Sequence, residues 1–167
     1  KDLPEDSIPF VPTKVECQII TRSPKIPQEE IDRVKNELRD YTERVNNGTA
    51  QFSTLALLYS EDKGSAQNGG ELGFSSRTSF VPEFANVAFN LTDPKAVSKI
   101  VETEFGYHII QLIEKRGDLV NCRHILRKPR VTTEALQQCI NDLDSIKGEI
   151  AKGLYTFDEC VMWVSSD

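Results

Sequence analysis

The residues best suited to chemistry lie in one stretch, residues 69–91, and at a histidine further along the chain. Paired glycines open the stretch, and a short amphipathic helix that begins at Pro82 and carries Phe84 closes it. Glycine lets the backbone turn tightly, and proline suits a first helical turn. Together they predict a small apolar binding pocket. His108 stands alone in an apolar strand pattern, where a histidine by itself is usually structural.

The composition indicates an ordinary globular chain and argues against a nucleic-acid partner. The 167 residues are 38% hydrophobic, which is ample for a core, and their net charge is −6. Binding a nucleic-acid backbone needs a basic face, which this balance does not favour. The sequence has no apolar run of the length that spans a membrane. It starts without a signal peptide, as expected for a cut inside a longer protein.

The four cysteines show neither a metal-binding nor a redox pattern. Cys17, Cys122, Cys139 and Cys160 form no CxxC pair, and no histidine stands at metal-ligand spacing from them. The sequence therefore predicts no metal and no cofactor. We interpret the cysteines as small core residues, with one disulfide among the last three as the alternative.

The elements that must position the pocket follow from apolar periodicity. Apolar residues at three- and four-residue spacing predict a helix over residues 29–46, and a second apolar helix is predicted over 52–59. Strands are predicted at 15–20, 97–101 and 107–113. Residues 1–12, with three prolines and no apolar period, read as an arm or linker.

An internal repeat follows the last predicted strand. Adding 105 to a residue number takes Cys17 to Cys122, and the same shift keeps prolines, glycines and apolar positions in step without a gap. Among the other matched pairs are Arg22 and Arg127, Gly48 and Gly153, and Phe52 and Phe157. Residues 118–167 are therefore predicted to be the N-terminal part of a second, incomplete copy of the domain at 13–117.

Four motifs in residues 13–117 resemble the parvulin-type peptidyl-prolyl isomerases. They are YSED at 59–62, GGELGF at 69–74, FVPEF at 80–84 and TEFGYHII at 103–110. The tandem copies after a proline-rich arm are similar to SurA-like chaperones. The resemblance implies an α+β fold of order βαααβαββ, in which helices wrap a four-stranded antiparallel sheet.

The resemblance also implies roles for individual residues. Leu72, Phe80 and Phe84 would line a proline pocket, although Leu72 and Phe84 also fit plain core positions. His108 would be catalytic, hydrogen-bonded by Thr103, with Asp62 nearby. Parvulins typically pair two histidines, the first of which lies on the opening strand. The first copy has Gln18 or Ile19 at that place, whereas the second copy has His124.

Two functions follow from these residues. The first is a peptidyl-prolyl isomerase that acts on proline-containing or unfolded polypeptides, outer-membrane proteins among them, in the periplasm, and whose activity is weak because one histidine is missing. The second is a catalytically inactive groove that holds extended clients. A purely structural spacer is a third interpretation. Arg77 alone stands near the pocket, so no preference for phosphate is predicted.

Overall fold

The computed structural model describes residues 14–15 and 17–166, which form two compact units. One unit contains residues 25–135. The other combines the described residues up to Pro24 with residues 136–166. The predicted arm, residues 1–12, lies outside the described residues. Over the part of the chain that is described, no helix has the length and apolar character to cross a bilayer.

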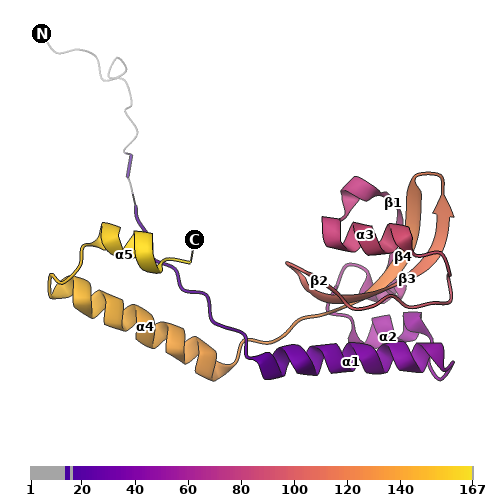
Figure 1. The fold of residues 1–167 in the computed structure, drawn as a ribbon, viewed down its shortest axis with the longest axis horizontal. Helices are drawn as coiled ribbons and strands as arrows, with labels where there is room; N and C mark the ends of the chain where they lie inside the picture. Colours follow the sequence, from indigo (N-terminus) through magenta and orange to yellow (C-terminus); the bar gives the residue numbers. More distant parts are fainter. Residues whose placement is uncertain (1–13, 16, 167) are drawn as a thin grey trace, which may run out of the picture. The chain divides into compact units, whose positions relative to one another are not determined.

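The unit of residues 25–135 is a four-stranded antiparallel sheet with three α-helices (Figure 1). In chain order its elements are α1 (Gln28–Asn46), α2 (Phe52–Tyr59), the 3₁₀ turn η2 (Ala66–Asn68), β1 (Glu71–Ser76), the 3₁₀ turn η3 (Arg77–Ser79), α3 (Pro82–Asn90), β2 (Val101–Thr103), β3 (Gly106–Arg116) and β4 (Leu119–Arg127). The strand order across the sheet is β1-β4-β3-β2. The predicted α+β fold is confirmed.

Each face of the sheet has its own core, because alternate residues of a strand point to opposite sides. Helices α1 and α2 pack on one face, where Val34, Leu38 and Leu55 meet Ile109 and Ile125. Helix α3 packs on the other face. There the buried cluster consists of Phe84, Ala88, Val101, Ile110, Leu112, Val120 and Cys122.

The interior strand β4 is the last element of the sheet in the chain, whereas the expected order placed that strand first. Residues 17–24 form no strand, and Ile19 is exposed. Strand β4 pairs with β1 on one side and with β3 on the other. A two-residue connection joins β3 to β4, so this pairing closes a short loop, and it buries Val120 and Cys122 completely. The expected domain boundary after residue 117 therefore falls inside a hairpin.

Two other strands also differ from the expectation. Strand β1 lies in a stretch for which the apolar pattern predicted no strand. Strand β2 begins at Val101, and in the stretch predicted to be a strand before it, Val97 makes an isolated bridge to Gln111.

Hydrogen bonds fasten β4 to the two helices beneath it. The backbone N–H of Glu61 donates to the carbonyl oxygen of Leu126 at 2.8 Å, and the N–H of Leu126 donates to the Ser60 hydroxyl at 3.2 Å. The guanidinium of Arg127 forms a two-pronged ion pair with Glu37 on α1, at 2.6 and 2.9 Å. These contacts fix the register of β4 over α1 and α2.

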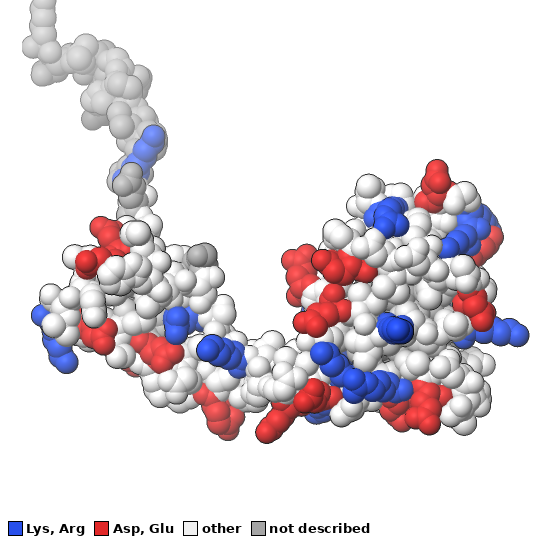
Figure 2. Space-filling model, viewed as in Figure 1, with Lys and Arg blue, Asp and Glu red and all other residues white. Residues whose placement is uncertain are grey.

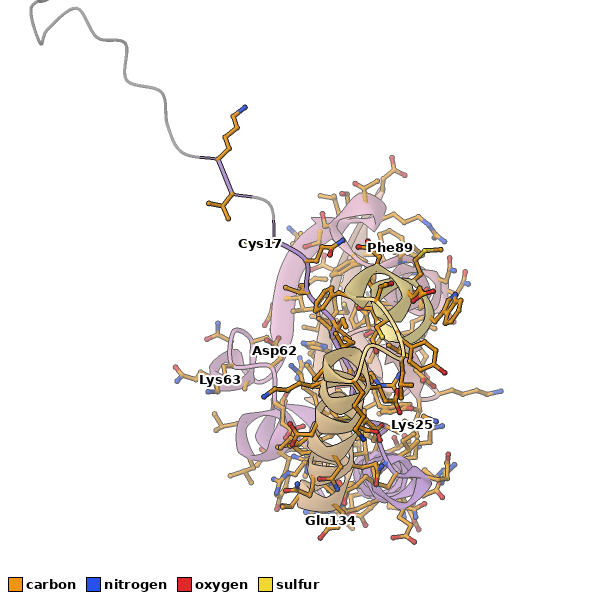
Figure 3. All side chains as sticks on the ribbon, turned by 90° about the vertical axis from the view of Figure 1, so that its left-hand side faces the viewer. Cys17, Lys25, Asp62, Lys63, Phe89 and Glu134 are labelled. Carbon is orange, nitrogen blue, oxygen red and sulfur yellow. The ribbon has the colours of Figure 1, made fainter. Side chains whose placement is uncertain are left out.

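The second unit contains two helices, α4 (Thr133–Ala151, whose first turn precedes the unit) and α5 (Phe157–Val164). Thr156 caps α5, because its hydroxyl accepts from the N–H of Glu159 while the Glu159 carboxylate accepts from the N–H of Thr156. An extended segment that begins near Cys17 runs beside α5 (Figures 1 and 3). Its Thr21 accepts a backbone hydrogen bond from Ser166.

The cysteines divide between exposed and buried positions. Cys122, Cys139 and Cys160 are buried and free, as expected of small core residues. Cys17 is free and exposed, so the interpretation as a core residue does not hold for it. Burial raises the pKa of Cys122 to about 12, which keeps this thiol protonated and unreactive.

Candidate active site

Two histidines face each other on the side of the sheet that α3 covers. His108 on β3 pairs with Leu126, and His124 on β4 pairs with Ile110, so the histidines are diagonal neighbours on one face. Their Nδ1 atoms lie 3.2 Å apart. Both side chains are buried, at 3% and 6% exposure. The domain therefore contains a histidine pair, whose second member comes from the strand expected to open another copy.

The far side of each imidazole is also hydrogen-bonded. The Thr103 hydroxyl lies 2.8 Å from Nε2 of His108, the contact that the sequence analysis expected. Nε2 of His124 lies 2.8 Å from the Asp62 carboxylate and 3.1 Å from the Ser65 hydroxyl. The Ser65 hydroxyl donates to the same carboxylate at 2.5 Å. The network thus runs from Thr103 through both imidazoles to Asp62.

One assignment of protons satisfies the whole network with both histidines neutral. The N–H of Phe105 donates to the Thr103 hydroxyl, which is then free to donate to Nε2 of His108. His108 donates from Nδ1 to Nδ1 of His124, and His124 donates from Nε2 to Asp62. We assign these tautomers from the partners, because each donor then meets an acceptor.

The electrostatics agree with neutral imidazoles. Burial first, and then the neighbouring His124, lower the pKa of His108 to about 4. Burial also lowers the pKa of His124, against the opposing effect of Asp62. Burial works to raise the pKa of Asp62, but hydrogen bonds from Ser65 and His124 outweigh it, so that pKa is lowered and the group is ionised. At neutral pH the carboxylate is the charged member of the network.

An apolar wall stands against the histidine pair. The ring of Phe84 on α3 lies 5.6 Å from each imidazole centroid and nearly perpendicular to both, at 83°. Phe80 lies 5.1 Å from Phe84, and Leu72 packs on the same cluster. Phe84 is buried, whereas Phe80 and Leu72 are half-buried. An apolar ligand at this wall would therefore meet Phe80 and Leu72 before Phe84.

The structure brings together all but one of the residues expected at the site. Gln18, expected to stand in for the first histidine, lies in the other unit and donates to Asp158 at 2.5 Å. His124 occupies the place beside His108 instead. Ser65 is a member that the sequence analysis missed. Its spacing of three residues after Asp62, ahead of paired glycines, was the available signal.

The buried histidine pair predicts a dependence of stability on pH. Unfolding returns His108 from a pKa of about 4 to its ordinary value of 6.5, so between these values the unfolded chain binds the extra proton. The free energy of unfolding should therefore fall as the pH drops through this window, by roughly 3 kcal/mol for this group. Urea unfolding at pH 7, 5.5 and 4 measures it. His108→Gln should flatten the slope, and an equal slope in both proteins would contradict the prediction.

Comparison with known proteins gives the family. The family described as "Rotamase: PPIC-type PPIASE domain" matches residues 19–114, more than half of the chain. The chaperone SurA of Shewanella oneidensis is 44% identical over 85 residues, which are 51% of this chain and 19% of that protein.

Two further relatives match over a longer stretch. The chaperone SurA of Shewanella frigidimarina is 40% identical over 120 residues, and that of Chromohalobacter salexigens is 35% identical over 117, which cover 68% and 70% of this chain. The matched stretch spans only 27% and 26% of those two relatives. With the four-stranded sheet and the paired histidines, these matches show that the chain belongs to the PPIC-type, or parvulin-type, peptidyl-prolyl isomerase family.

Proposed function

We propose that the unit of residues 25–135 is a peptidyl-prolyl cis/trans isomerase that binds proline in an apolar pocket beside the histidine pair. The observation that carries the proposal is the placement of Phe84. Its ring contacts both imidazoles and also belongs to the apolar wall with Phe80 and Leu72. An apolar wall of this kind suits a proline ring. Because the pair is complete, the weak activity expected from a missing histidine is no longer part of the proposal.

The chemistry requires no nucleophile. Rotation about a peptide bond crosses a barrier of about 18–20 kcal/mol, because resonance holds the amide flat. An enzyme accelerates it by binding the twisted amide better than either planar form. An apolar pocket that grips the ring and excludes water favours this twisted state, in which the nitrogen has lost its conjugation.

The histidine pair serves this reaction by holding the pocket in place. Both Nδ1 atoms are used within the pair, and both Nε2 atoms are engaged by Thr103 and by Asp62 with Ser65. This leaves no ring nitrogen for proton transfer to the substrate. Neutral, fixed rings give Phe84 two rigid faces to pack against. In this proposal His108, Thr103 and Asp62, the residues expected to be catalytic, position the pocket.

We propose that the substrates are unfolded polypeptides, since the relatives are named chaperones. We propose outer-membrane proteins in the periplasm as the natural clients. A preference for phosphate is not part of the proposal. Arg77 donates to Asn86 and lies over the ring of Phe89. On the face shown in Figure 2, acidic and basic side chains are interspersed over the unit that contains α1 to α3.

Exchange spectroscopy on proline peptides tests the activity. We expect the chain of 167 residues to accelerate cis/trans exchange of a Phe-Pro peptide in NMR. Phe80→Ala should reduce kcat/KM at least tenfold, about 1.4 kcal/mol of transition-state binding, because it removes half-buried pocket surface. Phe74→Ala is the matched control. This exposed aromatic lies under Arg116 outside the pocket cluster, so its loss should leave the rate unchanged.

The alternative function predicts a different outcome. A groove that only holds clients would show peptide-induced chemical shift changes but no accelerated exchange in the unmodified chain. That result would overturn the isomerase proposal and favour the client-holding module. Equal effects of Phe80→Ala and Phe74→Ala would place the proline elsewhere.

A further inference from the structure

We infer that the two related halves of this chain have exchanged their opening segments, residues 17–24 and β4. In this arrangement, β4 from the second half completes the sheet that packs on α1 and α2. Residues 17–24 from the first half pack with α4 and α5. Residues that are related by the 105-residue shift of the repeat make the same contacts in the two units. In each unit, however, the opening segment comes from the other half of the chain.

Two buried positions of the helices correspond between the two units. The buried Val34 of α1 corresponds to the buried Cys139 of α4, and the buried Leu55 of α2 corresponds to the buried Cys160 of α5. At these two positions, α4 and α5 bury the stripe that α1 and α2 turn toward their sheet. The apolar face of the α4–α5 pair is thus suited to a strand like β4.

The backbone contacts of residues 17–24 repeat those of β4. In the unit of α1 and α2, the N–H of Glu61 donates to the carbonyl oxygen of Leu126 at 2.8 Å. In the other unit, the N–H of Ser166 donates to the carbonyl oxygen of Thr21 at 2.9 Å. Ser166 is the repeat partner of Glu61, and Thr21 is the repeat partner of Leu126.

The hydroxyl that follows each second helix repeats as well. The N–H of Leu126 donates to the Ser60 hydroxyl at 3.2 Å, and the N–H of Thr21 donates to the Ser165 hydroxyl at 3.2 Å. These pairs are again related by the same shift. Two consecutive matches fix one register, because a slip by one residue would turn the strand over.

An arginine locks each strand in the same way. Arg127 forms an ion pair with Glu37 on α1. Its repeat partner Arg22 forms an ion pair with Asp142 on α4, at 3.4 Å. Asp142 is the repeat partner of Glu37. Each arginine also donates from Nη1 to the carbonyl oxygen of the residue just before the matched serine. That oxygen belongs to Tyr59 in one unit, at 3.0 Å, and to Val164 in the other, at 3.1 Å. Four contacts thus coincide, two of them through side-chain guanidinium groups.

The exchange determines which unit contains His124. The position of His124 in the repeat corresponds to Ile19. Strand β4 therefore supplies His124 as the partner of His108, and the segment that carries Ile19 packs with α4 and α5. The family match, residues 19–114, includes Ile19 and omits β4, because it follows the linear copy of the domain. Residue order alone would thus assign the wrong strand to the site.

Engineered disulfides in the 167-residue chain, in a Cys17→Ser background, test the exchange without reference to isomerase activity. The hydroxyls of Thr21 and Ser165 lie 3.3 Å apart, so Thr21→Cys with Ser165→Cys should form an intrachain disulfide under mild oxidation. Thr21→Cys with Ser60→Cys should not, although these residues would meet if the strand served its own copy. Non-reducing electrophoresis and peptide mass mapping measure both pairs.

Leu126→Cys with Ser60→Cys is the positive control, because it joins the matched pair in the other unit. A disulfide between Thr21 and Ser60 would overturn the inference. A disulfide that forms only between two chains would also overturn it, as would no disulfide between Thr21 and Ser165 when the positive control forms. None of these variants replaces His108 or His124.

Discussion

Replacing His124 with isoleucine is expected to reduce isomerase activity at least a hundredfold, about 2.7 kcal/mol in transition-state binding. His124 lies outside the stretch that matches the family, yet it donates to Asp62 and accepts from His108. Isoleucine at this place removes the partner of the buried Nδ1 of His108 and one of the hydrogen bonds to Asp62, and Phe84 loses one of its two ring contacts. Exchange spectroscopy on a Phe-Pro peptide measures the effect.

The reciprocal change separates the exchanged arrangement from a linear one. Ile19→His alone should leave the rate of isomerisation unaltered. The double variant with His124→Ile and Ile19→His should stay inactive, because residue 19 belongs to the other unit. If residues 15–20 lay beside β3 instead, the double variant would restore a histidine pair. Recovery of activity in the double variant would therefore contradict the exchange.

Milder variants separate a positioning role from simple loss of the fold. His124→Gln can keep the hydrogen bond to Asp62, and His124→Asn can keep the one to His108. Both should retain more stability than the isoleucine variant. An amide does not reproduce the flat ring that packs on Phe84, so kcat should still fall. Urea unfolding beside the exchange measurement distinguishes the two effects.

Gly70→Ala is expected to have the largest effect on stability of any single methyl addition to the sheet. A Cβ at this position would lie 2.3 Å from the carbonyl oxygen of His124 and 3.0 Å from Cβ of Ala56. The φ of Gly70 is +81°, which is strained for any other residue. Backbone oxygens yield little, so we expect a loss of roughly 3–5 kcal/mol from overpacking and strain together.

Gly73→Ala is the matched control for this change. Its φ is +73°, close to that of Gly70, but a Cβ there would meet nothing within 4 Å. It should cost only the backbone strain, about 1–2 kcal/mol. Urea unfolding of both variants isolates the steric part as their difference. Equal losses would show that β4 moves freely away from Gly70 and that the close approach is not essential.

The helices could be predicted from the sequence because their signals are local. The apolar period and the prolines at 27 and 82 place α1 and α3 within a residue or two, and α2 falls at its predicted bounds. Strand β3 is longer than predicted, since its charged end continues to pair with β4. Strand β1 was missed because serines and glycine carry little strand propensity, and its pairing with β4 supplies what its own residues lack.

The histidine pair could be predicted only in part, because pairing between strands is not a local property. His108 and Thr103 lie five residues apart across a tight turn, and the sequence was enough to connect them. His124 was recognised as the missing kind of residue but was assigned to another domain. The alternation of apolar and polar residues along a strand does not determine which sheet the strand joins. The ion pair of Arg127 with Glu37, 90 residues apart, became visible only in the fold.

The late position of β4 also bears on how the domain forms during synthesis. Strand β4 is interior to the sheet, yet it leaves the ribosome after every other element of its unit. Until then β1 has no neighbour to pair with, and α1 and α2 lack the apolar surface of Ile125. Non-local pairing of this kind slows folding. The nascent domain therefore stays open until the histidine itself emerges, and closing the sheet and assembling the site become a single event.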